Sequence, residues 1–183
     1  LRRLYPDARI YTKDDATVSV LKNLDNPGML HIATHGFYSS DDPRNIFDNN
    51  PMNRSGLVFT GVNNSTEYQT RLLASEAATL NLHDTRLVVL SACESGLGDS
   101  TDGEGVYGMR RALSIAGAQS QVVSLWPVSD QATRVFMQKF YTRVHNGEPL
   151  AQAMRGVKQE MKASEEWSDP VFWAPFILTG SWN

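Results

Sequence analysis

The feature that most constrains the fold is an uninterrupted run of apolar residues near the middle of the chain. Residues 86–92 have the sequence RLVVLSA, in which four apolar residues follow one another and two of them are β-branched. A strand with one face in water alternates apolar and polar residues, whereas a short continuous run is typical of a strand buried on both faces. We therefore predict that this segment is a central strand of a sheet that is covered on both sides.

Short apolar runs and amphipathic stretches alternate along the rest of the chain. Further strands are predicted at residues 29–34, 56–60, 121–126 and 176–179. Helices are predicted at residues 16–21, 73–80, 106–116, 130–145 and 149–163. This alternation is typical of an α/β domain with a largely parallel sheet.

The length and charge of the chain exclude several classes of protein. Its 183 residues suit one domain with a single core, so we expect residues 1–183 to form one domain. With 17 basic and 20 acidic residues the formal charge is −3, and no basic excess is available to bind nucleic acid. No apolar run approaches the roughly 20 residues that span a bilayer, so no membrane association is expected. The chain begins at Leu1, and its first residues read as the middle of a sequence pattern rather than its start. We therefore expect the chain to be a piece of a longer protein.

The chain contains one cysteine, Cys93. A single cysteine forms neither an internal disulfide framework nor a cysteine-rich zinc site, and a free thiol fits a reducing compartment such as the cytoplasm. Taken alone, such a cysteine is more often a small buried hydrophobe than a nucleophile. The role of Cys93 therefore depends on its neighbours.

Two predicted strands end in polar or reactive residues. The first ends in Ala-Thr-His-Gly, which places His35 and Gly36 at its carboxyl end, and the second ends in Ser-Ala-Cys, which places Cys93 there. The carboxyl ends of parallel strands lie on one edge of a sheet, where sites in open α/β folds gather. Adjacent strands are about 4.8 Å apart, so we expect His35 and Cys93 to meet across a small cleft.

These residue types suit nucleophilic catalysis. A thiol becomes a good nucleophile when it loses its proton, and a nearby imidazole can accept that proton and later give one to a leaving amine. The resulting oxyanion needs hydrogen-bond donors. The backbone N–H groups of Gly36, which has no Cβ to block a substrate, and of Cys93 are the predicted donors.

Several motifs in order along the chain resemble one family. They are LHIATHG at residues 30–36, LVVLSACESGLG at 87–98, GEGV at 103–106, SLWPVSD at 124–130 and FWAPF at 172–176. Together they resemble the CHAT domain, a caspase-like peptidase domain related to separase and often attached to tetratricopeptide repeats. The resemblance extends from about residue 28 to residue 182.

The resemblance implies a fold and a set of roles. It implies a mostly parallel, caspase-like central sheet flanked by helices on both faces. The family's catalytic histidine falls on His35, its nucleophile on Cys93, and its backbone oxyanion donors on Gly36 and Cys93. No cofactor or metal is implied. Family domains usually begin with a further strand and helix before residues 8–11, so part of the amino-terminal region is expected to lie outside this chain.

Three further residues are candidates for substrate binding. Separase-like relatives use an acidic residue in the corresponding motif to receive a basic P1 side chain, and Asp130 matches that position. Asp130 or Ser129 is also a suitable amino-terminal cap for the helix that follows, and the two roles are compatible. Trp126 and Trp173 are candidates for pocket walls, although buried aromatic residues more often belong to a core.

Two other kinds of site, a dinucleotide-binding site and a zinc site, are suggested by short motifs in the sequence. Residues 103–108 spell G-x-G-x-x-G, but about ten residues separate Cys93 from Gly103, whereas a dinucleotide-binding motif follows its strand in a tight turn. His31 and His35 suggest a zinc pair, but on a strand they lie about 13 Å apart, too far to share one metal. We interpret His31 as a packed or hydrogen-bonded residue in or near the core.

The sequence therefore predicts a cysteine endopeptidase that cleaves protein substrates with His35 and Cys93 and is regulated by attached repeats or by a partner protein. The alternative is an interaction module that binds a partner and keeps a latent peptidase site until a signal releases it.

Overall fold

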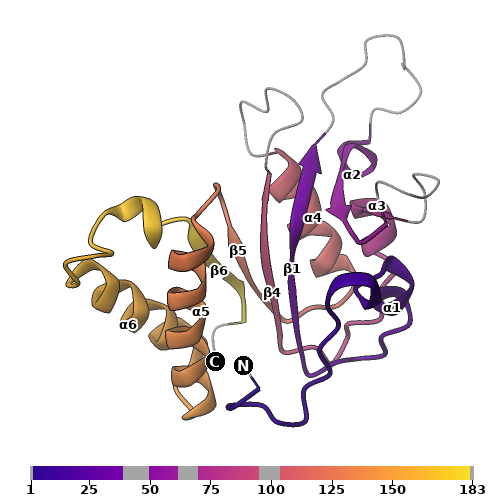
Figure 1. Ribbon diagram of the computed structural model, residues 1–183. Helices are drawn as coiled ribbons and strands as arrows, with labels where there is room; N and C mark the ends of the chain where they lie inside the picture. Colours follow the sequence, from indigo (N-terminus) through magenta and orange to yellow (C-terminus); the bar gives the residue numbers. More distant parts are fainter. Residues whose placement is uncertain (1, 39–49, 62–69, 95–103, 182–183) are drawn as a thin grey trace.

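A computed structural model describes residues 2–38, 50–61, 70–94 and 104–181, with the backbone alone for residues 51, 92–94 and 104–106. These residues form a six-stranded sheet with the order β3-β2-β1-β4-β5-β6 (Figure 1). The strands are β1 (Met29–Tyr38), β2 (Ser55–Val58), β3 (Arg71–Leu73), β4 (Leu87–Glu94), β5 (Ser120–Ser124) and β6 (Phe176–Gly180).

The centre of the sheet is parallel and its margins are not. β1 pairs with β4, and β4 with β5, in parallel, whereas the β1–β2, β2–β3 and β5–β6 pairs are antiparallel. The predicted α/β class is confirmed, and the sheet is mixed, with β2 and β6 running against the other strands.

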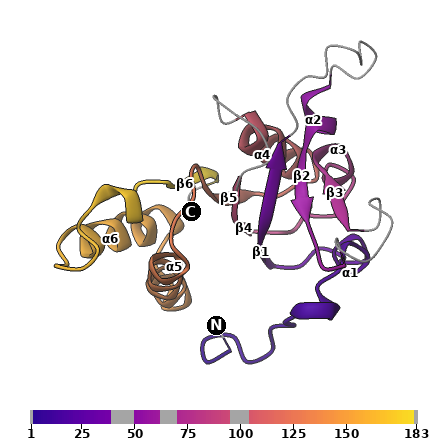
Figure 2. The same cartoon turned by 45° about the horizontal axis from the view of Figure 1, so that its top comes forward.

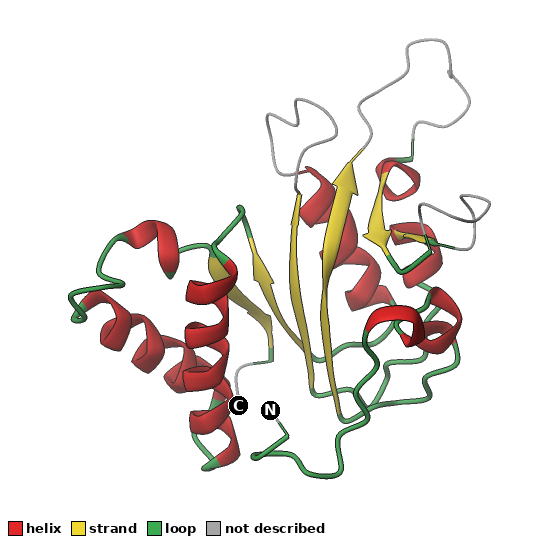
Figure 3. Ribbon diagram, viewed as in Figure 1, coloured by secondary structure: helices red, strands yellow, loops and turns green. Residues whose placement is uncertain are grey.

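Helices cover both faces of the sheet (Figure 3). They are α1 (Val18–Lys22), α2 (Pro51–Arg54), α3 (Ala74–Ala77), α4 (Glu104–Ile115), α5 (Asp130–His145) and α6 (Leu150–Lys162), with short 3-10 turns at Lys13–Asp15 and Pro170–Phe172. Figure 2 shows α5 and α6 on one side of the molecule and α1, α3 and α4 on the other. Within the parts of the chain that the structure describes, no helix combines the length and apolar character needed to cross a bilayer.

β4 is the central strand that the apolar run predicts. Leu87 and Val89 are buried against α5 and α6, while Val88 and Leu90 are buried against α4 and its neighbours. None of the four side chains is more than 4% exposed. Successive strand residues point to opposite faces, so both faces of β4 are core, which explains why the run is continuous rather than alternating.

Several predicted boundaries change. The helix predicted at residues 73–80 is reduced to α3, because Arg71–Leu73 forms β3 against β2. The first helix is capped by Thr17, whose side chain accepts a hydrogen bond from the Val20 N–H at 3.2 Å, and Asp14 and Asp15 belong to the preceding 3-10 turn.

Candidate active site

The structure brings the backbones of the two predicted catalytic residues together. In the parallel β1–β4 ladder His35 is the register partner of Cys93, and Gly36 is the register partner of Glu94. Register partners in neighbouring strands lie at the strand spacing, about 4.8 Å, and occupy the same face of the sheet. The predicted meeting of the two segments at one edge is therefore confirmed for the backbone, and the catalytic roles of His35 and Cys93 stay predictions.

β1 continues beyond the point at which the sequence predicts its end. His35 pairs with Val58 and Gly36 with Leu57, because β2, the next strand along the chain, folds back on β1 and supplies antiparallel partners as far as Tyr38. The Thr34 hydroxyl also donates a hydrogen bond to the Val58 carbonyl. Gly36 thus lies between two paired strands rather than at a free strand end, and the oxyanion role of the Gly36 and Cys93 N–H groups stays a prediction.

The β1 side chains next to this position face solvent. Ala33 and His35 are exposed, whereas Ile32, on the opposite face of the strand, is buried in the core beneath α4. The open face is the one that carries α5 and α6 further along the sheet. On this face of β1, the residue next to His35 is Ala33, which has a small side chain, and the residue after it is His31. A substrate that approaches His35 therefore meets little side-chain bulk from β1 before it reaches His31.

His31 lies in a partly buried polar network on this same face. Its Nε2 is 3.1 Å from the Ser91 Oγ, and its Nδ1 is 3.1 Å from the hydroxyl of Tyr141 on α5. The imidazole and phenol rings also stack, with centroids 5.7 Å apart. Burial lowers the pKa of His31 to about 4, so the ring is neutral near pH 7.

This network confirms the interpretation of His31 as a packed or hydrogen-bonded residue in or near the core. Both ring nitrogens face hydroxyl groups, so neither is directed at a metal shared with His35. Among the residues whose placement is described, no cluster of three or more His, Cys, Asp and Glu side chains suits a metal ion.

Tyr141 is a part of this region that sequence reasoning missed. A tyrosine on the apolar face of a helix gives no sign of its hydrogen-bond partner, because that partner is 110 residues away in the chain. Burial raises the pKa of the Tyr141 hydroxyl, with a further contribution from Tyr5. The Tyr5 ring packs edge-on against Tyr141 at 6.1 Å and against His145 at 5.3 Å, so the amino-terminal segment covers the network.

The candidate substrate-binding residues follow β5. Ser129 is the amino-terminal cap of α5, because its hydroxyl accepts a hydrogen bond from the Ala132 N–H at 3.2 Å. Asp130 is the first helical residue and is exposed, so the capping alternative for Asp130 is wrong. Trp126 is 38% exposed and donates its indole N–H to the Val171 carbonyl at 3.3 Å. Because β5 is parallel to β4, the segment that follows β5 begins at the same edge of the sheet as His35. Trp126 and Asp130 lie in that segment, and their roles in substrate binding stay predictions.

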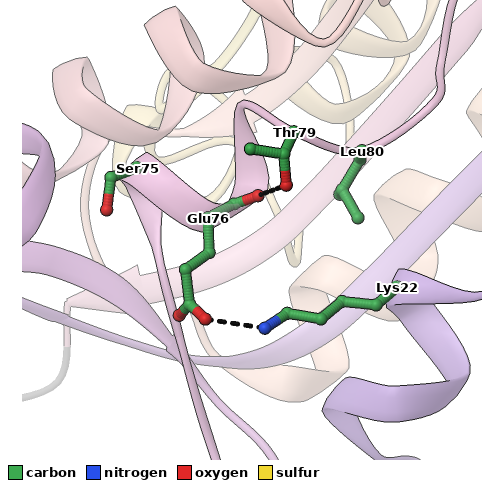
Figure 4. Close-up of a pocket in the computed structure, with 5 residues that line it drawn as sticks. All are labelled: Lys22, Ser75, Glu76, Thr79 and Leu80. Carbon is green, nitrogen blue, oxygen red and sulfur yellow. Dashed lines mark hydrogen bonds and ion pairs between the residues drawn. The ribbon is translucent and has the colours of Figure 1, made fainter.

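A separate hollow lies between α1 and α3. It has a volume of about 340 Å³ and is lined by Lys22, Ser75, Glu76, Thr79 and Leu80 (Figure 4). The Lys22 ammonium pairs with the Glu76 carboxylate at 2.6 Å, and Glu76 also accepts a hydrogen bond from the Leu73 N–H. These charges satisfy each other and link α1 to α3, and the hollow includes none of the predicted catalytic residues.

The glycine-rich motif does not follow a strand in a tight turn. β4 ends at Glu94 and α4 begins at Glu104, and Gly103 lies outside the described residues. The separation between strand and helix disfavours the dinucleotide-binding alternative, since that motif joins the two directly.

Comparison with known proteins identifies a family and two relatives. A family model described as the CHAT domain matches residues 1–181. Human tetratricopeptide repeat protein 28 is 36% identical over 111 residues, which cover 60% of this chain and 4% of the human protein. The mouse protein of the same name is 35% identical over 111 residues with the same coverage. The chain therefore matches only a small part of these much longer relatives.

Proposed function

Because this chain belongs to the CHAT domain family, a family of caspase-like peptidases, we propose that it is a cysteine endopeptidase in which Cys93 is the nucleophile and His35 transfers protons. The observation that carries the proposal is the register of β1 and β4, in which these two residues are direct partners. The exposure of His35 supports it further, because a substrate must reach the imidazole.

The proposed reaction has two steps. His35 accepts the Cys93 proton while the sulfur bonds to the scissile carbonyl carbon, and the imidazolium then protonates the leaving amine as the C–N bond breaks. A water molecule next attacks the thioester, gives a proton to His35 and releases the carboxylic acid, and the proton returns to the thiol. Backbone N–H groups of Gly36 and Cys93 are the proposed oxyanion donors in both steps.

We also propose that the peptidase cleaves protein substrates after a basic residue, with Asp130 as the partner of that residue and Trp126 as an adjacent apolar wall. In support, Asp130 is exposed and Ser129, rather than Asp130, caps α5, so the Asp130 carboxylate is not required for the cap. A carboxylate and a guanidinium form strong charge-assisted hydrogen bonds.

Regulation by attached repeats or a partner protein is part of the same proposal. The matching relatives are named as tetratricopeptide repeat proteins, and the matched region is a small share of each. The same observation favours the second candidate, an interaction module with a latent site. A free thiol nucleophile also needs a reducing environment, so the proposal includes a cytoplasmic location.

The experiment measures covalent labelling of the single cysteine. The chain is treated with a peptidyl electrophile that carries Arg at P1, and the mass increase is located by peptide mapping. We expect labelling at Cys93 that disappears in Cys93→Ala and falls by about 10² to 10⁴ in rate in His35→Ala, the range attributed to general acid–base groups. His83→Ala removes an exposed histidine outside the site and serves as the matched control.

The outcomes separate the two candidates. Labelling that is as fast in His35→Ala as in the unaltered chain would refute the dyad. Peptide cleavage that persists in Cys93→Ala would refute the nucleophile. A partner that binds equally well to Cys93→Ala, together with an unreactive thiol in the complex, would favour the interaction module.

A further inference from the structure

A groove lies along the outer edge of the sheet, away from the β1–β4 pair. It has a volume of about 630 Å³, and its walls are α6, β6 and the segment that precedes β6. β6 is the last strand in the sheet order, with β5 on one side and no described strand on the other. The groove is therefore next to backbone that has no ladder partner among the described residues.

The apolar part of the groove reaches both faces of β6. Ile177 and Leu178 both line it, although successive strand residues point to opposite faces. Side chains from both faces are accessible together only along the edge of a strand. Met154 of α6 and Trp173 complete the apolar lining, and Trp173 is held by a hydrogen bond from its indole N–H to the Ser168 carbonyl at 3.2 Å. Trp173, a candidate wall of a substrate pocket, lines this separate groove, and a role for it in substrate binding stays a prediction.

The wall that α6 contributes is basic. Arg155, Lys158 and Lys162 line the groove and recur at spacings of three and four residues, which places them on one face of the helix. No carboxylate of the described residues forms an ion pair with these three groups. The chain as a whole carries a charge of −3, so this basic wall is a local excess rather than a general property.

The acidic residue of α6 is turned away from the groove and toward α5. Glu160 accepts hydrogen bonds from Lys139 at 2.5 Å and from Arg143. The helix thus separates its charges. Its carboxylate is paired at the α5 contact, and its groove cations have no ion-pair partner within the described parts of the chain. Burial also lowers the pKa of Lys158, as expected for a cation that is partly removed from water.

We propose that this groove binds an acidic, extended segment of a partner protein, which adds as a strand to the free edge of β6. Main-chain groups of the segment pair with β6, its apolar side chains contact Leu178 and Trp173, and its carboxylates face Lys158 and the two neighbouring cations. This is the mode in which an extended peptide completes a sheet, with main-chain hydrogen bonds for affinity and alternate side chains for specificity.

Charge argues against a second copy of this chain as the occupant. A two-fold pairing of β6 with β6 would bring each groove against the other, and Arg155, Lys158 and Lys162 of both copies would share the interface. Like charges placed together at an interface are costly. Basic side chains beside an edge strand also discourage pairing between two copies of the same chain. They do not repel an acidic strand.

The test measures binding of a short probe peptide to the whole 183-residue chain. The probe is an acetylated, fluorescently labelled hexapeptide of sequence Glu-Leu-Glu-Val-Glu-Leu, and the control probe has Lys in place of each Glu. We expect the acidic probe to bind and the basic probe not to bind, with affinity that falls as salt rises. Hydrogen exchange should show new protection in β6 amides at residues 176–180.

A charge-reversed variant tests the location. Lys158→Glu should weaken binding of the acidic probe by at least about tenfold, the size expected when one interfacial charge pair becomes a repulsion. Arg111→Glu makes the same change in net charge at an exposed position on α4 and should change the affinity by less than about twofold. Neither residue belongs to the proposed catalytic pair.

Five results would overturn the proposal. The first four are equal binding of the two probes, equal weakening by Lys158→Glu and Arg111→Glu, protection that appears elsewhere while β6 amides stay unchanged, and no binding of the acidic probe together with a monomeric chain in sedimentation. The fourth result would assign the basic wall to protection of the edge alone. Self-association that Lys158→Glu abolishes would also overturn it, because it would make a second copy the occupant.

Discussion

The buried position of His31 makes the stability of this domain sensitive to pH in a defined window. In the folded chain burial lowers the His31 pKa from 6.5 to about 4, and in the unfolded chain the ring returns to its ordinary value of 6.5. Between these two values the unfolded chain binds a proton at His31 and the folded chain does not. Stability rises with pH wherever the unfolded state binds more protons, so acidification through this window destabilises the fold.

The magnitude follows from the two pKa values. One tenfold difference in proton affinity corresponds to about 1.4 kcal/mol, so the His31 contribution changes by about 2 kcal/mol between pH 7 and pH 5. The two carboxylates whose pKa is lowered, Glu76 and Glu160, contribute mainly below this range. Glu160, for example, has its pKa lowered below 4.5 by hydrogen bonds from Lys139 and Arg143, so its contribution is present above 4.5 and is lost as the pH falls further.

Urea unfolding at pH 7 and pH 5 measures this effect. The unaltered chain should lose about 2 kcal/mol more over this interval than His31→Gln, which has no titrating ring at this position. His31→Gln is itself less stable at pH 7, because Ser91 and Tyr141 lose a well-placed partner, so the comparison uses the pH dependence of each variant. His83→Gln removes an exposed ring and should retain the full pH dependence. Equal pH dependence in His31→Gln and the unaltered chain would refute the reasoning.

Four further substitutions have defined consequences. Ser129→Ala removes the α5 cap and should cost about 1 kcal/mol in urea unfolding, whereas Asp130→Asn should leave stability within about 0.5 kcal/mol and raise KM for substrates with Arg at P1. Equal effects of the two variants on stability would contradict this assignment of the cap. Phe136→Ala removes a fully buried ring stacked on Phe176 at 4.1 Å and should cost about 4 kcal/mol, lowering the melting temperature in calorimetry. Gly180→Ala should also lower it, because Gly180 has φ +98° and an added Cβ would lie 2.2 Å from the Gln119 carbonyl oxygen. A melting temperature unchanged in either variant would contradict the packing described for that position.

The parts of the fold that the sequence predicted correctly are those determined by local pattern. The continuous apolar run gave β4, because burial on both faces requires apolar residues at every position. The helices at Asp130–His145 and Leu150–Lys162 were predicted within one or two residues, because their apolar periodicity and the Asn146–Gly147 ending are local signals.

The parts that sequence reasoning missed depend on distant partners. β1 continues to Tyr38 because residues 55–58 pair with its second half, and no local pattern marks that pairing. β3 has three residues and exists because β2 lies beside it. The meeting of His35 and Cys93 could be predicted, since parallel strands bring their carboxyl ends together, but the exact register between strands comes from the three-dimensional packing.

The His31–Tyr141 contact has a geometric consequence for the candidate site. α5 follows a strand that is parallel to β1 and packs back along the sheet, so both α5 and β1 extend from this contact toward the same edge. His35 lies four residues along β1 from His31, about 13 Å at the strand rise. Asp130 lies eleven residues along α5 from Tyr141, about 16 Å at the helix rise. The two distances are similar, so Asp130 is expected to lie at about the same height above this partly buried hydrogen bond as His35 does. This supports Asp130 as a residue at the level of the proposed catalytic pair, and the His31–Tyr141 hydrogen bond is one of the contacts that hold α5 against the sheet.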